Sequence, residues 1–503
     1  MLRLGYYLTK YGRAGGAVRL RCLSSISPNS TKIPESVCII GSGPSGFYTL
    51  KYLLSHPNAP KKVDIVDSSR VPFGLIRTGV APDHGDVKNA QSEFTQIIEG
   101  DNASTDVRFL GGVAIGEGEK VKLSDVEGHY DAVVLCHGAS LSNELDLPAY
   151  KPDGSKVQSP PVVRVRDAVE WYNAASWAEE PGFREAVVRR GGEGLNITVI
   201  GGGNVSLDLA RVFAKGRRGI LRDSEVRDEE IEEMAGWGVG TIGLYNRRGA
   251  YQTAFTTKEF RDIYKMAKAG NTALRIDVED IERSSNKESL EEMEGNRPMT
   301  RLIKLIKQVA EDDEVKEGEG AQISVRYLRS PSEIHTDEEG NMKSVRFELQ
   351  ELSGEKGAQR AVGTGVFEDV ETDVLVSSMG YKASPLDERL PFEGGRYKHE
   401  RGHVDGKVFS AGWCKRGPKG IVGTNIADAR ETVGRIYEGT ETRGQVGGAD
   451  FVEFLEKKGV EYSTWEGWQR VDEIERDEKR LREGQTRNKI KDEEKIRRIA
   501  MGR

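Results

Sequence analysis

Two stretches of the chain show the same change of pattern: a short apolar run, then glycines, then apolar residues at helical spacing. The first is VCIIGSGPSGFYTLKYLL, residues 37–54, and the second is ITVIGGGNVSLDLARVFAKG, residues 197–216. Short apolar runs that end at glycine predict buried strands of a parallel sheet, and the spacing that follows predicts amphipathic helices. The pattern therefore predicts an α/β protein in which the strand–glycine turn–helix unit of a dinucleotide-binding fold occurs twice.

The first unit carries the complete glycine fingerprint G-x-G-x-x-G as Gly41, Gly43 and Gly46. The first glycine permits a tight turn, the second lets a pyrophosphate approach the backbone, and the third lets helix and strand pack closely. The next predicted strand, residues 63–67, ends in Asp67, where a carboxylate can bind ribose hydroxyls. A chain with two such units is laid out like a two-dinucleotide flavoprotein, which favours FAD in the first.

The second unit differs from the first in ways that bear on its ligand. Residues 201–203 are all glycine, and Ser206 stands where the third glycine of the fingerprint is expected. The strand that follows ends not in an acid but in Arg247 and Arg248. An acid would favour a free ribose 2′-hydroxyl, whereas two guanidinium groups bind a 2′-phosphate through charge-assisted hydrogen bonds. The second unit is therefore predicted to bind NADP(H) rather than NAD(H).

Near the C-terminus the pattern of a strand, a glycine-rich loop and a helix appears again. Residues 408–412 predict a strand and residues 426–436 a helix, with Trp413, Gly417 and Gly420 between them. The indole could stack on a flat ring and glycine N–H groups could reach flavin or nicotinamide edges, although Trp413 as a core residue is the alternative. If this segment joins the first sheet, the second dinucleotide domain is an insertion in the first.

We therefore predict an α/β fold with two Rossmann-like domains of the glutathione-reductase-like type, the NADP domain inserted in the FAD domain. Two dinucleotides would then meet at the domain junction, where one can bring a hydride and the other receive it. The predicted boundaries are residues 1–34 for a leader, 35–137 and 379–485 for the FAD domain, 138–378 for the NADP domain and 486–503 for a charged C-terminal tail.

Composition and charge narrow the class of protein further. A length of 503 residues is too great for one core, and a net charge of −7 argues against nucleic acid as a partner. No apolar run approaches the ~18–20 residues that span a bilayer. Four cysteines stand far apart without a C-x-x-C, which argues against a metal site and a dithiol centre. Cys38 and Cys136 lie in apolar runs and are expected in the core.

The first 34 residues carry six Lys and Arg, four Ser and no acid. This composition is typical of a mitochondrial transit peptide, and a basic tail without a targeting role is the alternative.

Six blocks of sequence occur in the order found in one known family. They are GSGPSGFYT, VPFGLIRTGVAPDH, GGGNVSLDLAR, RRGAYQTAFTTKEFRD, SSMGYKASPLD and AGWCKRGPKGIVGTNIADA. From about residue 36 to about residue 485 the chain resembles the mitochondrial adrenodoxin reductase family, ferredoxin–NADP reductases of glutathione-reductase-like architecture.

The resemblance implies a set of site residues. FAD contacts are expected from Gly41, Gly43, Pro44, Ser45, Gly46, Asp67, Leu75, Val113, Trp413, Gly420, Ile421 and Val422. NADP contacts are expected from Gly202, Gly203, Asn204, Val205, Arg247, Arg248 and Glu259. His84 is expected near the isoalloxazine ring, and His84, Asp208 and Glu259 are expected to orient groups or relay protons. The chain departs from the family at Gly202, where Gln is common, and at Asp67, where Glu is more usual.

The resemblance also implies an activity: NADPH:ferredoxin oxidoreductase, with a hydride passing to FAD and single electrons to a mitochondrial [2Fe–2S] ferredoxin. Iron–sulfur cluster assembly, haem modification and cytochrome P450 pathways are all open as destinations, and a matrix location with or without peripheral attachment to the inner membrane is implied. A disulfide reductase needs a cysteine pair that is absent here, and the NADPH-oxidising subunit of glutamate synthase usually brings cysteine-rich segments. A redox-sensing NADP-binding module without flavin is the non-enzymatic alternative.

An acidic reductase needs a local basic face to bind an acidic ferredoxin. Residues 294–310 predict an amphipathic helix with Arg297, Arg301 and Lys304 on one face. The resemblance assigns Arg297 and Arg301 to ferredoxin docking, and an ordinary solvated helix face is the alternative. Residues 471–503 are almost wholly charged and are expected to form a solvated helix or tail without chemistry.

Overall fold

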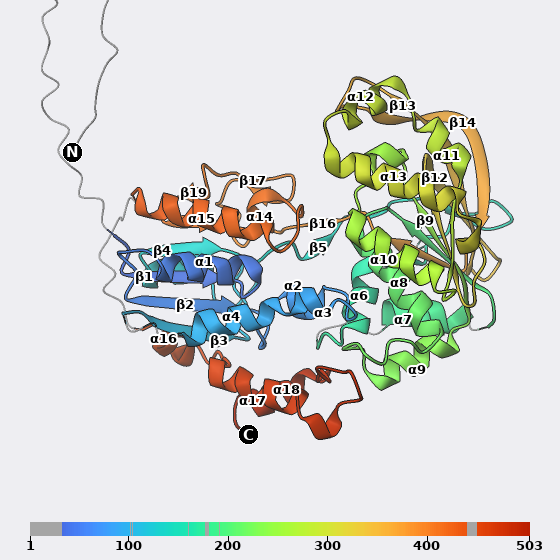
Figure 1. Cartoon of the computed structure of the whole chain (residues 1–503). Coiled ribbons are helices and arrows are strands. Elements are labelled where there is room, and N and C mark those ends of the chain that lie inside the picture. The colour runs from blue at the N-terminus through green and yellow to red at the C-terminus, as the bar shows by residue number, and fades with distance from the viewer. Residues whose placement is uncertain are drawn as a thin grey trace, which may run out of the picture.

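The protein consists of two domains side by side, each built on its own largely parallel β-sheet (Figure 1). The computed structural model describes residues 33–503 with the exception of 101, 103, 159, 177–180, 191 and 440–449. The expected transit peptide, residues 1–34, lies almost wholly outside the described residues.

The first domain is built on a sheet with the strand order β19–β20–β4–β1–β2–β3, parallel except for the pair β19 and β20. Its strands are β1 (Ser36–Ile40), β2 (Lys62–Asp67), β3 (Asp106–Gly111), β4 (Ala132–Leu135), β19 (His403–Asp405) and β20 (Val408–Ser410), with a small hairpin of β17 (Phe392–Glu393) and β18 (Arg396–Tyr397). Its helices are α1 (Pro44–Leu54), α2 (Leu75–Thr78), α3 (Gly85–Lys88), α4 (Ala90–Glu99), α5 (Leu123–His129), α14 (Trp413–Arg416), α15 (Thr424–Tyr437) and α16 (Phe451–Lys457).

Both faces of this sheet are buried, which explains why the first apolar run has no polar alternation. Val37 and Ile39 belong to the core layer that α1, α4 and α15 cover. Cys38 and Ile40 belong to the opposite layer, under α5 and α16. Cys38 and Cys136 are both buried, as their apolar surroundings in the sequence predicted.

The second domain contains a fully parallel sheet and a smaller, mostly antiparallel one. The parallel sheet has the order β10–β11–β9–β8–β15–β7, and the smaller sheet has the order β14–β13–β12–β6. The strands are β6 (Ala149–Tyr150), β7 (Val162–Arg164), β8 (Leu195–Ile200), β9 (Val239–Tyr245), β10 (Ala273–Ile276), β11 (Gln322–Arg326), β12 (Arg329–Thr336), β13 (Met342–Ser353), β14 (Arg360–Glu371) and β15 (Val374–Ser377). The helices are α6 (Val165–Tyr172), α7 (Pro181–Arg190), α8 (Asn204–Arg217), α9 (Asp228–Gly236), α10 (Thr257–Lys268), α11 (Val278–Arg283), α12 (Lys287–Met293) and α13 (Arg297–Glu311).

The second domain is inserted in the first. β20 pairs in parallel with β4, with Val408 opposite Val133, so residues far apart in the chain complete one sheet. The chain crosses between the domains at β5 (Leu141–Ser142) and β16 (Tyr381–Lys382), which pair antiparallel. The predicted α/β fold with an inserted domain is confirmed.

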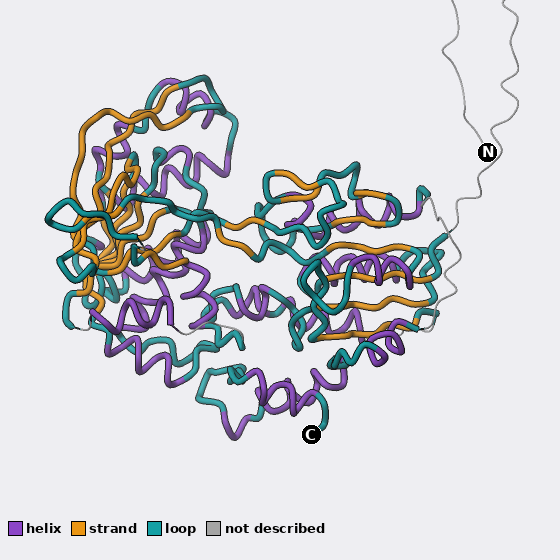
Figure 2. Tube along the Cα trace, turned by 180° about the vertical axis from the view of Figure 1, so that it is seen from behind, coloured by secondary structure: helices purple, strands orange, loops and turns teal. Residues whose placement is uncertain are grey.

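The expectation of a solvated C-terminal segment is wrong. α17 (Trp465–Glu475), α18 (Glu493–Ala500) and the chain between them lie along one side of both domains in both views (Figures 1 and 2). Arg487 is 1% exposed and Lys489 is 2% exposed. Arg487 is paired with Asp472 and Glu475 of α17, and Lys489 with Glu225 of the second domain. A local pattern of charges does not reveal these partners.

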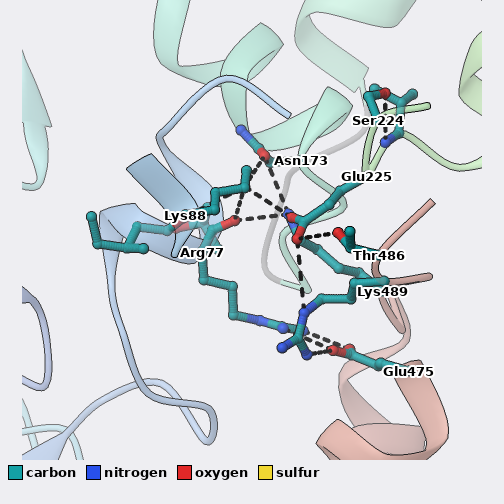
Figure 3. A network of polar contacts seen from close by, with 12 residues as sticks. Arg77, Lys88, Asn173, Ser224, Glu225, Glu475, Thr486 and Lys489 are labelled. Carbon is teal, nitrogen blue, oxygen red and sulfur yellow. Dashed lines mark hydrogen bonds and ion pairs between the residues drawn. The ribbon is translucent and has the colours of Figure 1, made fainter. Parts of the chain in front are cut away.

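A buried polar network joins this segment to both domains (Figure 3). The Arg77 guanidinium of the first domain donates two hydrogen bonds, of 2.8 and 2.6 Å, to the Glu475 carboxylate. Arg487 Nη1 donates to the same carboxylate at 2.7 Å. Lys489 Nζ lies 3.2 Å from Glu225 of the second domain and donates to the Arg77 carbonyl at 2.8 Å. The segment therefore connects the two domains through paired charges.

Candidate active site

The first glycine turn is shaped by close backbone contacts and leaves one side open. Gly41 has φ +113°, and a methyl group there would lie 2.5 Å from the carbonyl oxygen of Cys136. A methyl group at Gly46 would lie 2.0 Å from the Gly41 carbonyl oxygen, whereas one at Gly43 would meet nothing within 4 Å. Gly43 is also the N-cap residue of α1, which therefore has no side-chain cap, and its first turn holds no acid. Open space next to uncapped N–H groups suits a pyrophosphate.

Asp67 lies at the end of β2 and is bound to the same turn. Its Oδ2 accepts hydrogen bonds from Ser42 N at 2.6 Å and Ser42 Oγ at 2.7 Å, and its Oδ1 accepts one from Ser69 N at 2.8 Å. Burial raises the pKa of Asp67, and the hydrogen bonds from Ser42 and Ser69 oppose that shift. The carboxylate is held firmly next to the turn, and its contact with a ribose stays a prediction.

The loop before α14 lies directly against the first turn. Gly412 has φ +81°, its N–H donates to Asp428 Oδ2 at 2.5 Å, and a methyl group there would lie 2.6 Å from Ser45 Oγ. Trp413 follows, with its ring 6.2 Å from that of Tyr381 at an interplanar angle of 18°. Two aromatic rings, one from the first domain and one from the connection between domains, are thus stacked near the domain junction.

Other predicted FAD contacts gather around the same edge of the sheet. Gly74 precedes Leu75 and closely approaches Gly43, because a methyl group on Gly74 would lie 3.0 Å from Gly43 Cα. Val113 N donates to the Asp67 carbonyl oxygen at 2.9 Å. Leu75 is 43% exposed and Ile421 62% exposed, so two apolar side chains face away from the protein core. Pro44, Gly420 and Val422 occupy the start of α1 and the loop before α15.

The second glycine turn repeats the features of the first. Gly201 has φ +118°, and a methyl group there would lie 2.3 Å from the Ser378 carbonyl oxygen, whereas one at Gly203 would meet nothing within 4 Å. α8 begins at Asn204 without a side-chain cap, because its N-cap residue is Gly203. Asn204 Oδ1 accepts a hydrogen bond from Thr256 N at 2.8 Å. Val205, in the first turn of α8, packs partly against the core.

Asn246 contacts the second turn, and sequence reasoning missed it. A methyl group at Gly202 would lie 1.5 Å from Asn246 Oδ1. The side chain of Asn246 therefore occupies the space that a side chain at position 202 would need. The signal in the sequence was its place at the end of a strand, directly before the two arginines.

Arg247 and Arg248 follow Asn246 and are both exposed. Among the described residues, neither guanidinium has an ion-pair or hydrogen-bond partner. Glu259 lies in the first turn of α10, and its buried Oε2 has no hydrogen-bond partner among the described residues. Unpaired cations at the end of β9 suit a phosphate.

His84 and Asp208 lie where the two domains meet. The Arg211 guanidinium donates to both oxygens of Asp83 at 2.9 Å and to Asp208 at 2.7 Å. His84 Nε2 is 3.9 Å from Asp262 Oδ2, one turn beyond Glu259 on α10. A cavity of about 320 Å³ is lined by Asp83, His84, Arg211, Lys215, Ile220, Asp262, Lys265, Met266 and Asn271. Burial raises the pKa of Asp208, although Arg211 and His84 oppose that shift.

Comparison with known proteins identifies the family. The sequence profile described as pyridine nucleotide-disulphide oxidoreductase matches residues 35–232. NADPH:adrenodoxin oxidoreductase of Arabidopsis thaliana is 31% identical over 475 residues, which are 88% of this chain and 91% of that protein. The Bos taurus protein of the same name is 31% identical over 482 residues, 92% of this chain and 91% of that protein. The chain belongs to the NADPH:adrenodoxin oxidoreductase family.

A solved structure supports the same assignment. Mycobacterium tuberculosis FprA in complex with NADPH has a TM-score of 0.80 and 26% sequence identity, and the match covers 93% of this chain and 100% of that one. Family membership confirms the expected fold class and the expected class of enzyme, an oxidoreductase. The described cysteines are all buried and free, so none of them forms a disulfide in this member of the family.

The predicted docking residues lie on one exposed face of α13. Arg297, Arg301 and Lys304 are exposed, and among the described residues none of them has an ion-pair partner. The opposite face buries Leu302, Ile303, Leu305, Ile306, Val309 and Ala310. α13 lies on the side of its domain that is turned toward the first domain (Figures 1 and 2). Helix α12 lies beside α13 and carries acids at 288, 291 and 292. The basic surface is therefore confined to the exposed face of α13.

Within the described ranges, no group of His, Cys, Asp and Glu is arranged to hold a metal ion. No helix in the described part of the chain has the length and apolar composition needed to cross a membrane.

Proposed function

We propose that this chain is an FAD-containing NADPH:ferredoxin oxidoreductase, with FAD in the first cradle and NADP(H) in the second. One observation carries the proposal: both glycine turns combine an open middle glycine with an uncapped helix. The second turn is in addition followed by Arg247 and Arg248, whose guanidinium groups have no partner among the described residues. Family membership supports both cofactors.

In this proposal some residues bind the two nucleotides and others position their rings at the domain junction. Gly43 and Gly203 let a pyrophosphate approach the backbone, and Arg247 and Arg248 hold the 2′-phosphate. Trp413 and Tyr381 form an aromatic wall beside the junction. FAD, when bound, supplies a ring that accepts a hydride and releases electrons one at a time. The chain itself needs no nucleophile for this chemistry.

His84, Asp208 and Glu259 serve as positioning residues in this proposal. The Asp83–Arg211–Asp208 network ties the loop before His84 to α8 of the other domain. This connection holds the two cradles in a fixed relation, so that nicotinamide and flavin can lie against each other without water between them.

The exposed face of α13 is proposed to bind a [2Fe–2S] ferredoxin. Arg297, Arg301 and Lys304 are exposed and form no ion pair within the described part of the chain, so an acidic partner can reach them without displacing one there. The relatives of the same name in plants and animals are mitochondrial, and residues 1–34 have the composition of a transit peptide. We therefore infer that the ferredoxin is a mitochondrial one.

The proposal is tested by cytochrome c reduction with purified protein, NADPH and a mitochondrial [2Fe–2S] ferredoxin. We expect a yellow preparation whose NADPH-dependent rate rises strongly when the ferredoxin is added. A colourless protein that binds NADP would favour the redox-sensing module instead. If the protein contains flavin but ferredoxin does not change the rate of cytochrome c reduction, the proposal that ferredoxin is the electron acceptor is refuted.

A further inference from the structure

The two cradles correspond position by position, which makes Asn246 the counterpart of Asp67. Gly41 N donates to the Val66 carbonyl at 2.7 Å, and Gly201 N donates to the Tyr245 carbonyl at 3.0 Å. The next residue on each strand is therefore Asp67 in the first cradle and Asn246 in the second. In dinucleotide-binding folds, this is the strand end from which a side chain reaches the adenosine ribose.

The two counterparts contact their glycine turns differently. Asp67 accepts two hydrogen bonds from Ser42, the residue after the first glycine. Gly202 holds the corresponding position in the second turn and offers no side chain. Asn246 Oδ1 fills the space instead, 1.5 Å from where a methyl group at Gly202 would lie. Asn246 thus brings a carboxamide to the space that a side chain at position 202 would occupy.

The backbone around Asn246 fixes the direction of its carboxamide. Nδ2 donates to the carbonyls of Arg326 at 3.1 Å and Leu244 at 3.4 Å. The main chain of Asn246 is held on both sides, because its N–H donates to the Arg326 carbonyl and its own carbonyl accepts from Arg329 N, both at 2.9 Å. Oδ1 has no donor among the described residues. A carboxylate would put a second oxygen against two carbonyls, so this position selects an amide.

We propose that Asn246 determines nucleotide specificity in the second cradle. Its Oδ1 accepts a hydrogen bond from a hydroxyl of the adenosine ribose, and its lack of charge leaves the neighbouring 2′-phosphate to Arg247 and Arg248. An acid at this position would repel that phosphate. The inference rests on the proposed binding of NADP(H). It adds that Asn246 can bind the adenosine ribose without repelling the 2′-phosphate on it.

The test is calorimetric titration with adenosine 2′,5′-bisphosphate and with AMP, which requires no turnover. Asn246→Asp, measured at pH 8.5 so that the carboxyl group is ionised, should lower the ratio of the two affinities by about tenfold. Asn246→Ala removes the acceptor without adding charge, so both ligands should weaken alike, by about 3-fold, and the ratio should stay the same.

A single and a double variant distinguish a role of Asn246 in nucleotide binding from a role in folding alone. Gly202→Gln alone should weaken binding of the bisphosphate, because its side chain meets Asn246. Gly202→Gln combined with Asn246→Gly should recover most of the affinity, because the amide is then supplied from the other side. This pair remains informative if the Asp variant fails to fold, and bound flavin reports folding in every variant.

The outcomes are distinguishable from failure of the proposed function. If the unaltered protein binds the bisphosphate no better than AMP, the assignment of NADP(H) fails. If it prefers the bisphosphate but Asn246→Asp keeps the full preference, the specificity role is overturned. Unchanged binding of both ligands by Asn246→Ala would overturn the hydrogen bond to the ribose.

Discussion

At the scale of single residues, the glycines of one motif are needed for different physical reasons. Gly41 and Gly46 are required by neighbouring backbone atoms, whereas Gly43 faces open space. The sequence predicted all three, because each role is encoded in the spacing of the motif. It did not reveal Asn246, whose role depends on how β8 and β9 align and on the missing side chain at Gly202.

This difference predicts opposite results for two alanine substitutions. Gly46→Ala should destabilise the flavin-free protein by about 1–3 kcal/mol, because its methyl group cannot fit against the Gly41 carbonyl. Gly43→Ala should leave the stability of the flavin-free protein within ~0.5 kcal/mol, because its methyl group meets no protein atom, yet it should retain little FAD. Denaturant unfolding and flavin content after purification measure the two effects. A stable, flavin-loaded Gly46→Ala protein would contradict this account of the turn.

At the scale of elements, the sequence predicted the buried face of an amphipathic helix, but it did not predict that a highly charged segment is buried. α13 was expected from the spacing of its apolar and basic positions, and it forms with that face buried. The C-terminal segment was expected to be solvated, yet Arg487 and Lys489 are buried. The difference lies in partners such as Glu225 and Glu475, which only the folded chain brings together.

The basic face of α13 predicts a selective loss of ferredoxin activity. Arg301→Glu should raise the apparent KM for ferredoxin by about tenfold, equivalent to ~1.4 kcal/mol, because it reverses an unpaired exposed charge. NADPH-dependent ferricyanide reduction should not change. The effect should fade as salt rises, since exposed charges are screened over ~8–10 Å.

Lys343→Glu provides the matched control, because it makes the same change of charge at an exposed position at the start of β13. It should leave both activities near those of the unaltered protein. Equal loss of ferredoxin and ferricyanide activity in Arg301→Glu would remove the docking role from α13.

The buried network predicts a large cost for removing its central charge. Glu475→Gln should destabilise the protein by about 3–5 kcal/mol, because Arg77 and Arg487 would remain buried without full compensation. Glu473→Gln, exposed on the same helix, should change stability by less than ~0.5 kcal/mol. Denaturant unfolding compares the two. Similar small losses would show that the network contributes little to stability.

At the scale of the whole molecule, the order of motifs was enough to predict an inserted domain. The prediction depended on the strand near residue 408 returning to the first sheet, and β20 does so beside β4. The way in which the two domains are held together was not predictable. It depends on Asp83 with Arg211, and on Glu225 with Lys88 and Lys489, pairs formed across segments far apart in the chain.

These interdomain carboxylates predict loss of stability in acid. Burial acts to raise the pKa of Glu225, but Lys88, Lys489 and Arg487 outweigh it and hold that pKa below its usual value. A carboxylate with a lowered pKa stabilises the fold above its unfolded pKa of about 4.3, and that contribution is lost as pH falls further.

The difference in unfolding free energy between the unaltered protein and Glu225→Gln should therefore be constant from pH 7 to pH 5. Below about pH 4 it should shrink by up to ~1.4 kcal/mol per pH unit. Denaturant unfolding at a series of pH values gives this difference directly. A difference that grows on acidification would mean that the pKa of Glu225 is raised, not lowered.

The central claim is that a phosphorylated nicotinamide nucleotide, held by Arg247 and Arg248, reduces a flavin held in the first cradle. Its most direct test is the anaerobic rate at which NADPH and NADH each bleach the flavin absorbance of the purified protein. The account predicts fast bleaching by NADPH, much slower bleaching by NADH at equal concentration, and loss of that preference in Arg248→Ala. Equal rates with the two nucleotides in the unaltered protein would contradict it.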